Sequence, residues 1–149
     1  MKKHLSFSSG KTKILGDNFS KKILKAHIRK RGATVVAMRG ELGSGKTTFT
    51  QGFLYGLGVR KRTASPTFIL MRKFKIVGNH PFKNFYHIDA YRIKDAKETS
   101  HLGLGDIFSD NKNIVLIEWA DKIKNILPRD SIWVKFLHGK KEDERAVYF

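Results

Sequence analysis

The 149-residue sequence has no cysteine and few acidic side chains, and it lacks long apolar runs. The absence of cysteine excludes a disulfide framework, a thiolate zinc site and a cysteine nucleophile. No apolar run approaches the roughly 18–20 residues that a membrane-spanning helix needs. The polar start over residues 1–6 does not continue into the apolar core of a signal peptide. These absences favour a soluble, cytoplasmic protein and predict no membrane association.

The size and composition of the chain favour one folded unit. Compact domains commonly contain about 100–150 residues, so a single domain over residues 1–149 is expected. The hydrophobic share of 40% and the aromatic share of 11% are typical of a globular protein. Such a composition argues against intrinsic disorder.

The scarcity of acids leaves a large positive charge, with 30 Lys and Arg against 13 Asp and Glu. Residues 1–31 contain ten basic side chains and Asp17 as the single acid, and residues 60–83 contain seven basic side chains and no acid. Residues 84–149 are balanced, with eleven of each sign. Two interpretations stay open: a solvated lysine-rich surface, or a patch that binds a polyanion such as RNA.

Hydrophobic periodicity predicts alternating helices and strands. Apolar residues from Leu15 to Ala26 recur at spacings of four, four and three, which predicts an amphipathic helix over residues 12–31 ended by Gly32. A second helix is expected over about residues 46–57, with Gly56 and Gly58 at its end. This alternation, with antiparallel additions at the sheet edges, predicts an α/β fold. The strands are expected over residues 34–38, 68–71, 74–77, 84–88, 114–117 and 131–137, with a last one within residues 143–149.

Residues 40–47, with the sequence Gly-Glu-Leu-Gly-Ser-Gly-Lys-Thr, satisfy the P-loop pattern G-x-x-x-x-G-K-[ST]. The motif directly follows a predicted buried strand and opens a helix, so its backbone N–H groups can surround phosphate oxygens. Lys46 is expected to contact the β- and γ-phosphates, and the Thr47 hydroxyl to ligate Mg²⁺. The sequence therefore predicts a site for a nucleoside triphosphate. The expected binding residues are Glu41, Leu42, Gly43, Ser44, Gly45, Lys46, Thr47 and Thr48.

Two acids follow predicted strands and are candidates for the metal and the reaction. Asp89 follows the strand over residues 84–88, and Glu118 follows the strand over residues 114–117. Ligands bind at this rim in open parallel sheets, so one acid is expected to hold Mg²⁺ and the other to orient the attacking water. The longer apolar run before Glu118 favours it as the metal acid. Each acid can instead be a helix cap or a surface residue at a strand end.

Three more residues are candidates near the phosphates. Thr67, in Ser-Pro-Thr-Phe at residues 65–68, stands where switch-type nucleotide hydrolases offer a hydroxyl to Mg²⁺ and the γ-phosphate. Arg92, three residues after Asp89, can neutralise phosphate charge. His87 is interpreted as a strand-end residue or as a residue behind the site, and not as a general base, because phosphoryl transfer depends mainly on positioning.

Short blocks in a fixed order extend over most of the chain. The P-loop is shared by many families, whereas the Ser-Pro-Thr-Phe, His-x-Asp-x-Tyr-Arg and Glu-Trp blocks are more specific. Together they resemble the bacterial TsaE family, small P-loop ATPases of tRNA threonylcarbamoyladenosine biosynthesis. Besides the P-loop, the blocks are Thr12 with Leu15-Gly16, Gly52, Leu57-Gly58, residues 65–68, residues 87–92, Glu118-Trp119 and Leu127-Pro128.

The resemblance implies an α/β P-loop NTPase fold with a central parallel sheet, flanking antiparallel strands and helices on both faces. It also implies weak Mg²⁺-dependent ATP hydrolysis in a complex with TsaD and TsaB. In that complex TsaD transfers the threonylcarbamoyl group to the adenosine beside the anticodon. Glu41 and Ser44 stand where aspartate and alanine are commoner, and neither change removes a phosphate contact. The family's functional positions fall here on Lys46, Thr47, Thr67, Asp89, Glu118 and Trp119.

Two other functions stay open at the level of sequence. A small-molecule kinase also uses a P-loop, but such kinases usually have an arginine-rich lid, which the charge-balanced C-terminal third does not offer. A basic nucleic-acid-binding module would use residues 1–31 and 60–83, although no aromatic side chains alternate with the basic ones as stacking platforms. The same two segments are the expected place of any direct tRNA contact.

Overall fold

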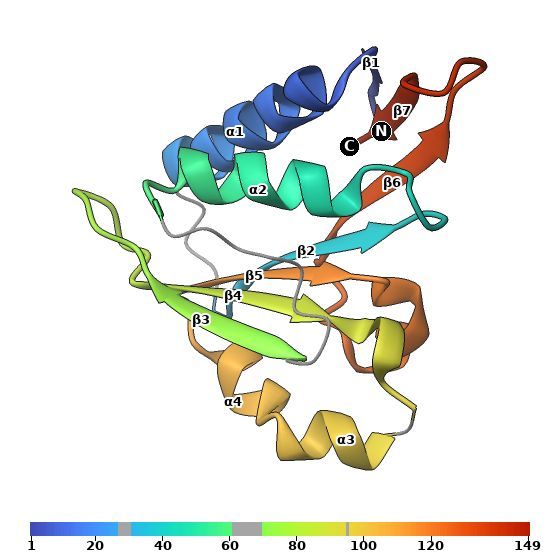
Figure 1. Ribbon diagram of the computed structural model, residues 1–149. Helices are drawn as coiled ribbons and strands as arrows, with labels where there is room; N and C mark the ends of the chain where they lie inside the picture. The colour runs from blue at the N-terminus through green and yellow to red at the C-terminus, as the bar shows by residue number, and fades with distance from the viewer. Residues whose placement is uncertain (27–30, 61–69, 95) are drawn as a thin grey trace.

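The protein folds as one seven-stranded sheet with helices on both faces (Figure 1). The structure is a computed structural model, and it describes residues 1–26, 31–60, 70–94 and 96–149. The strands are β1 (Lys3–Ser6), β2 (Thr34–Arg39), β3 (Met71–Lys75), β4 (Asn84–Asp89), β5 (Asn113–Glu118), β6 (Ile132–His138) and β7 (Arg145–Tyr148). The helices are α1 (Ser9–Ala26), α2 (Lys46–Gly56), α3 (Ala96–His101) and α4 (Leu104–Ser109), with 3₁₀ helices η1 (Ala90–Arg92) and η2 (Ala120–Ile126). Within the described ranges, no helix combines the length and the apolar character needed to cross a membrane.

The strand order is β1-β7-β6-β2-β5-β4-β3. The four central strands run parallel, because β2 pairs with both β6 and β5 and β4 pairs with β5 in that sense. The pairs β1–β7, β6–β7 and β3–β4 are antiparallel. The predicted α/β class, with a central parallel sheet and antiparallel strands at its edges, is confirmed.

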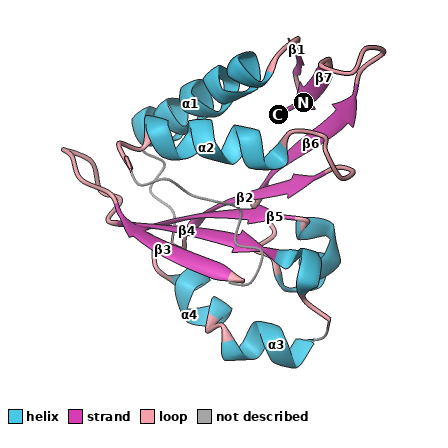
Figure 2. Ribbon diagram, in the orientation of Figure 1, coloured by secondary structure: helices cyan, strands magenta, loops and turns pink. Residues whose placement is uncertain are grey.

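Alternation along the strands divides the core into two layers, as period-two side-chain geometry requires. Helices α1 and α2 lie over one face of the sheet, and α3 and α4 lie on the other side (Figure 2). On β4, Phe85 packs in the first of these layers, whereas Tyr86 and Ile88 pack in the second. On β5, Leu116 belongs to the first layer and Ile117 to the second. His87, Asp89 and Glu118 therefore have the parity of the face that α2 covers.

Helices α1 and α2 contact each other through their backbones. A Cβ atom at Gly52 would lie 1.9 Å from the carbonyl oxygen of Lys13, and one at Gly16 would lie 2.1 Å from that of Phe49. A Cβ atom at Gly56 would lie 2.0 Å from the Ser20 hydroxyl. Gly16, Gly52 and Gly56 form what we call the glycine seam. The role predicted for Gly56, ending α2, is thus only part of its function, because Gly56 also lets α1 approach.

Several predicted boundaries need correction. The first helix begins at Ser9, earlier than residue 12, because Ser8 Oγ accepts a hydrogen bond from Lys11 N at 3.1 Å and caps the helix. The described part of α1 reaches Ala26, and residues 27–30, over which the prediction continues the helix, lie outside the described part. The predicted break between strands 68–71 and 74–77 is wrong, since β3 runs continuously from Met71 to Lys75 and residues 61–69 are not described. Strand β1 and helices α3 and α4 were not predicted, because each is only four to six residues long.

Candidate nucleotide site

The P-loop connects the carboxyl end of β2 to the first residue of α2. Gly43 and Gly45 adopt left-handed backbone angles, with φ of 72° and 100°. A Cβ atom at Gly40 would lie 2.7 Å from the carbonyl oxygen of Phe136 on β6, so only glycine fits there. No side chain caps the N-terminus of α2. Its first-turn N–H groups are therefore available to an anion, and the helix dipole favours one.

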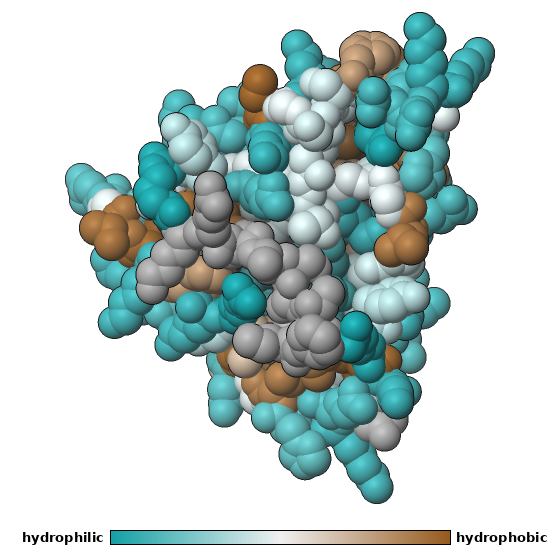
Figure 3. Space-filling view, in the orientation of Figure 1, coloured by the Kyte–Doolittle hydropathy of each residue, from teal (hydrophilic) through white to brown (hydrophobic). Residues whose placement is uncertain are grey.

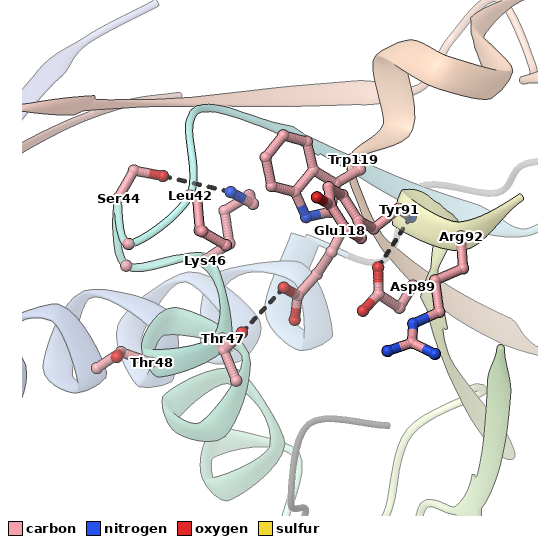
Figure 4. Close-up of a pocket in the computed structure, with 12 residues that line it drawn as sticks. Leu42, Ser44, Lys46, Thr47, Thr48, Asp89, Tyr91, Arg92, Glu118 and Trp119 are labelled. Carbon is pink, nitrogen blue, oxygen red and sulfur yellow. Dashed lines mark hydrogen bonds between the residues drawn. The ribbon is translucent and has the colours of Figure 1, made fainter. Parts of the chain in front are cut away.

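Lys46 is folded back onto the P-loop in a buried position, with 5% of its surface exposed. Its Nζ donates to the carbonyl oxygens of Gly40 at 2.8 Å and Glu41 at 2.7 Å. The ring of Trp119 covers the same ammonium, with its centroid 3.9 Å from Nζ (Figure 4). Burial lowers the pKa of Lys46, while the nearby carboxylates, Glu118 foremost, act in the opposite direction. The cleft thus contains a cation that neutral groups hold in place.

Glu118 ends β5, directly beside the P-loop strand β2, and its carboxylate is buried against α2. Its Oε2 accepts a hydrogen bond from Thr47 Oγ1 at 3.0 Å (Figure 4). Its Oε1 lies 2.9 Å from His87 Nε2 and 3.1 Å from Thr50 Oγ1. Among the two candidate acids, Glu118 is therefore the one in direct contact with the P-loop hydroxyl.

Asp89 is the register partner of Glu118 at the end of β4, so the two acids share one edge and one face of the sheet. Its Oδ1 accepts a hydrogen bond from Tyr91 N at 2.9 Å and caps η1. This is the helix-cap interpretation that the sequence left open. Asp89 nonetheless lines the cleft and contributes to the electrostatic field at Lys46.

Most of the predicted site residues line one cleft of about 340 Å³. Thr48 lies on the far side of the first turn of α2 from Glu118 (Figure 4). Glu41 lines a neighbouring hollow, and it reaches the site through its carbonyl oxygen on Lys46. Thr67 falls within residues 61–69, outside the described part. The predicted residues that line the cleft are Leu42, Gly43, Ser44, Gly45, Lys46, Thr47, Thr48, Asp89, Arg92, Glu118 and Trp119.

Comparison with known proteins decides the family. Residues 8–147 match the family model described as threonylcarbamoyl adenosine biosynthesis protein TsaE. The chain belongs to the TsaE family. A relative from Haemophilus influenzae named tRNA threonylcarbamoyladenosine biosynthesis protein TsaE is 40% identical over 119 residues, which are 80% of this chain and 71% of the relative. The protein of the same name from Bacillus subtilis is 36% identical over 115 residues, which are 77% of this chain and 68% of the relative.

A solved structure has the same fold as this TsaE-family chain. The crystal structure of Bacillus subtilis YdiB superposes with a TM-score of 0.72 at 25% sequence identity. The match covers 98% of this chain and 82% of that chain. The predicted membership of the TsaE family and the predicted P-loop fold are therefore both confirmed.

Two residues of the TsaE-family site were not singled out from the sequence. Thr50 was missed, although it lies one helical turn after Thr47 and so on the same face of α2. Tyr91 was quoted only as part of a motif; its ring packs against Trp119 with 4.9 Å between centroids. Trp119 has a left-handed backbone with φ of 57°, the one non-glycine residue with positive φ in the described ranges. The spacing of three residues from Thr47 was a sequence signal that could have indicated Thr50. No sequence signal indicated the left-handed backbone of Trp119.

The residues present fit a magnesium–nucleotide complex. In the part of the chain that the structure describes, no group of three or more His, Cys, Asp or Glu side chains could by itself hold a metal ion. Mg²⁺ in nucleotide sites usually takes few protein ligands and completes its shell with phosphate and water oxygens. Thr47 and Glu118 offer such oxygens 3.0 Å apart, next to the phosphate cradle.

Proposed function

We propose that this chain binds ATP with Mg²⁺ and supports threonylcarbamoyladenosine formation in tRNA as a weak ATPase, in a complex with homologues of TsaD and TsaB. The observation that carries the proposal is the contact between Thr47 and Glu118. It joins the P-loop hydroxyl to a buried acid on the neighbouring strand, 71 positions later in the sequence. Family membership supports the role in tRNA modification and is the ground for proposing the partners, and this contact supports the proposed chemistry.

Each residue then has a physical task. Lys46 exchanges the two carbonyl oxygens for phosphate oxygens, which carry full negative charge and bind an ammonium more strongly. The open N–H groups of the P-loop and of the first turn of α2 bind the remaining phosphate oxygens. Thr47 donates its hydroxyl proton to Glu118 Oε2 in a hydrogen bond, which would leave its oxygen lone pairs free for the metal. When bound, Mg²⁺ neutralises the charge that develops on the phosphates. Asp89 and Arg92, at the open side of the cleft, are proposed to act on the attacking water and on phosphate charge.

The test is ATP hydrolysis by the purified chain, alone and with purified TsaD and TsaB homologues. We expect slow hydrolysis that needs Mg²⁺ and that rises several-fold when both partners are present. A panel of nucleosides and small metabolites serves as the control, and none is expected to be phosphorylated. A phosphorylated metabolite would overturn the proposal in favour of a small-molecule kinase. A rate of ATP hydrolysis that does not change when both partners are added would contradict the partner-coupled role.

The structure restricts where tRNA contact can be proposed. Strands β1 and β3 are opposite edges of the sheet, so the basic residues on these two strands lie apart. On β3, exposed Lys73 and Lys75 also protect an edge strand from pairing with another chain. On α1, exposed Lys11, Lys22 and Lys25 recur at helical spacing on one side. Hydrophilic residues cover much of the view over α1 (Figure 3). We place the proposed tRNA contact on α1 and β1.

The pKa of His4 on β1 can be used to detect RNA binding at the surface formed by α1 and β1. Burial lowers the pKa of His4, and the positive charges of Lys2 and Lys22 lower it further. A bound RNA backbone favours the charged ring, so the His4 pKa is expected to rise in an NMR titration with a synthetic anticodon stem–loop. RNA affinity should also fall with salt, with a log–log slope of about −0.7 per phosphate neutralised.

A charge-matched pair of variants provides the control for the RNA contact. Replacing Lys11, Lys22 and Lys25 by alanine should flatten the salt dependence. Replacing Lys94, Lys112 and Lys124 removes the same charge elsewhere and should leave the slope unchanged. Equal losses in both triple variants, or an unchanged His4 pKa with RNA bound, would contradict a contact on α1 and β1.

A further inference from the structure

His87 is buried behind the nucleotide site and contacts the metal acid, not the cleft. It lies on β4 with 1% of its surface exposed, and it is absent from the residues that line the cleft. Its Nε2 is 2.9 Å from Glu118 Oε1. Register explains the geometry: His87 is two residues before Asp89, so it has the same parity and faces the same side of the sheet as Glu118.

The other group near Glu118 Oε1 cannot replace His87. Thr50 Oγ1 lies 3.1 Å from Oε1 and 3.0 Å from the carbonyl oxygen of Lys46, one helical turn earlier. A hydroxyl has one proton to donate, and here two acceptors compete for it at nearly equal distance. Thr50 therefore holds Oε1 only part of the time. Among the described residues, His87 is the one donor to Oε1 that has no second acceptor competing for its proton.

The His87 imidazole contacts Glu118 through its Nε2 atom. A carboxylate only accepts hydrogen bonds, so Nε2 must carry the proton that it donates to Glu118. His87 Nδ1 is buried and finds no hydrogen-bond partner in the described part of the chain. Nε2–H is thus the group of His87 that holds Glu118, and Nδ1 makes no competing hydrogen bond among the described residues.

We propose that His87 is a positioning residue for the magnesium site: its Nε2–H anchors Glu118 Oε1 so that Oε2 stays aimed at Thr47. The inference rests on the proposed function. Without the anchor, the Glu118 carboxylate can rotate about its last torsion and take Oε2 away from the Thr47 hydroxyl. The hydroxyl would then lose the acceptor that keeps its lone pairs toward the metal. Residues that orient metal ligands from behind commonly contribute 10–100-fold to metal affinity or activity.

The test compares two amides that differ in reach. In His87→Gln the amide nitrogen falls near the position of Nε2 and can still donate to Glu118, whereas in His87→Asn it falls near the position of Nδ1 and cannot. We expect His87→Asn to need about 10–100-fold more Mg²⁺ for half-maximal partner-stimulated hydrolysis. His87→Gln should stay within a few-fold of the unmodified chain. Tyr86→Phe, on the opposite face of β4, is the control for changes in the strand.

A second measurement does not depend on turnover. Calorimetric titration with a non-hydrolysable ATP analogue, with Mg²⁺ and with EDTA, separates metal-dependent affinity from phosphate binding by the P-loop. His87→Asn should bind the analogue as the unmodified chain does in EDTA and should lose most of the gain that Mg²⁺ provides. His87→Leu extends the series, and thermal melting shows whether each variant is folded.

The outcomes separate the two ideas. Equal Mg²⁺ dependence in His87→Asn and His87→Gln, with both folded, would overturn the positioning role and leave the proposed function intact. An unmodified chain that fails to bind the analogue with Mg²⁺ would overturn the proposed function itself. Weaker binding of His87→Asn in EDTA would also count against the positioning role, because it would show damage to the P-loop and not to the metal site.

Discussion

Lys46→Ala is expected to weaken ATP binding by about 10- to 100-fold in calorimetric titration and to remove measurable hydrolysis. The side chain provides the one ammonium that the structure places inside the P-loop in the described residues, with its Nζ on the carbonyl oxygens of Gly40 and Glu41. A hydrogen bond to a charged group contributes about 1.5–3 kcal/mol, and the upper value corresponds to roughly two orders of magnitude in affinity.

The same substitution should leave the folded state intact. Lys46 is a buried cation whose pKa is lowered by burial, so its charged form is held in the fold at a cost. Removing it is expected to keep or slightly raise the melting temperature. Lys112→Ala, at an exposed lysine after α4, is the matched control and should bind ATP normally. ATP affinity close to that of the unmodified chain in a folded Lys46→Ala would defeat the P-loop assignment.

Gly52→Ala is expected to be the most damaging single-methyl change to stability. The new Cβ would lie 1.9 Å from the carbonyl oxygen of Lys13 and 2.7 Å from its Cα, and both are backbone atoms that cannot rotate away. Helices α1 and α2 would have to separate. Overpacking of this kind costs about 1–3 kcal/mol and sometimes more. At about 3 kcal/mol, a domain of this size should melt roughly 6–12 °C lower in a thermal scan.

Gly105→Ala is the matched control for the glycine seam. Gly105 lies in α4, has no atom within 4 Å of an added Cβ, and has no left-handed backbone. Alanine is favoured over glycine in a helix by up to about 1 kcal/mol, so this variant should be as stable as the unmodified chain or more so. If Gly52→Ala melted at the same temperature as Gly105→Ala, the close approach of α1 and α2 would be disproved.

The parts of the fold that the sequence predicted are those with long apolar patterns. Strands β2 and β5 are continuous buried runs, and the P-loop between β2 and α2 has a motif that fixes its backbone. Short elements such as β1 and α4 were missed because four to six residues contain too little of either periodicity. Pairing order across the sheet also depends on long-range contacts that no local pattern encodes.

The candidate site divides in the same way. The strand-end rule placed Asp89 and Glu118 at one edge, and the register confirms that they are partners. Their different contacts were beyond the sequence, because they depend on which strand lies next to β2. Glu118 reaches Thr47 because β5 is that neighbour, and Asp89 is one strand further away. Local sequence likewise gives no sign that Trp119 turns its ring over Lys46, since this follows from an unusual backbone angle.

The glycine seam also bears on how freely the surface can evolve. The closest contacts between α1 and α2 are made by main-chain atoms and by buried side chains such as Phe19 and Phe49, so the exposed residues of α1 can change while α2 stays in place. Substitutions there can accumulate lysines without disturbing the phosphate cradle. The exposed lysines of α1 are therefore compatible with the close approach of α1 to the helix that follows the P-loop.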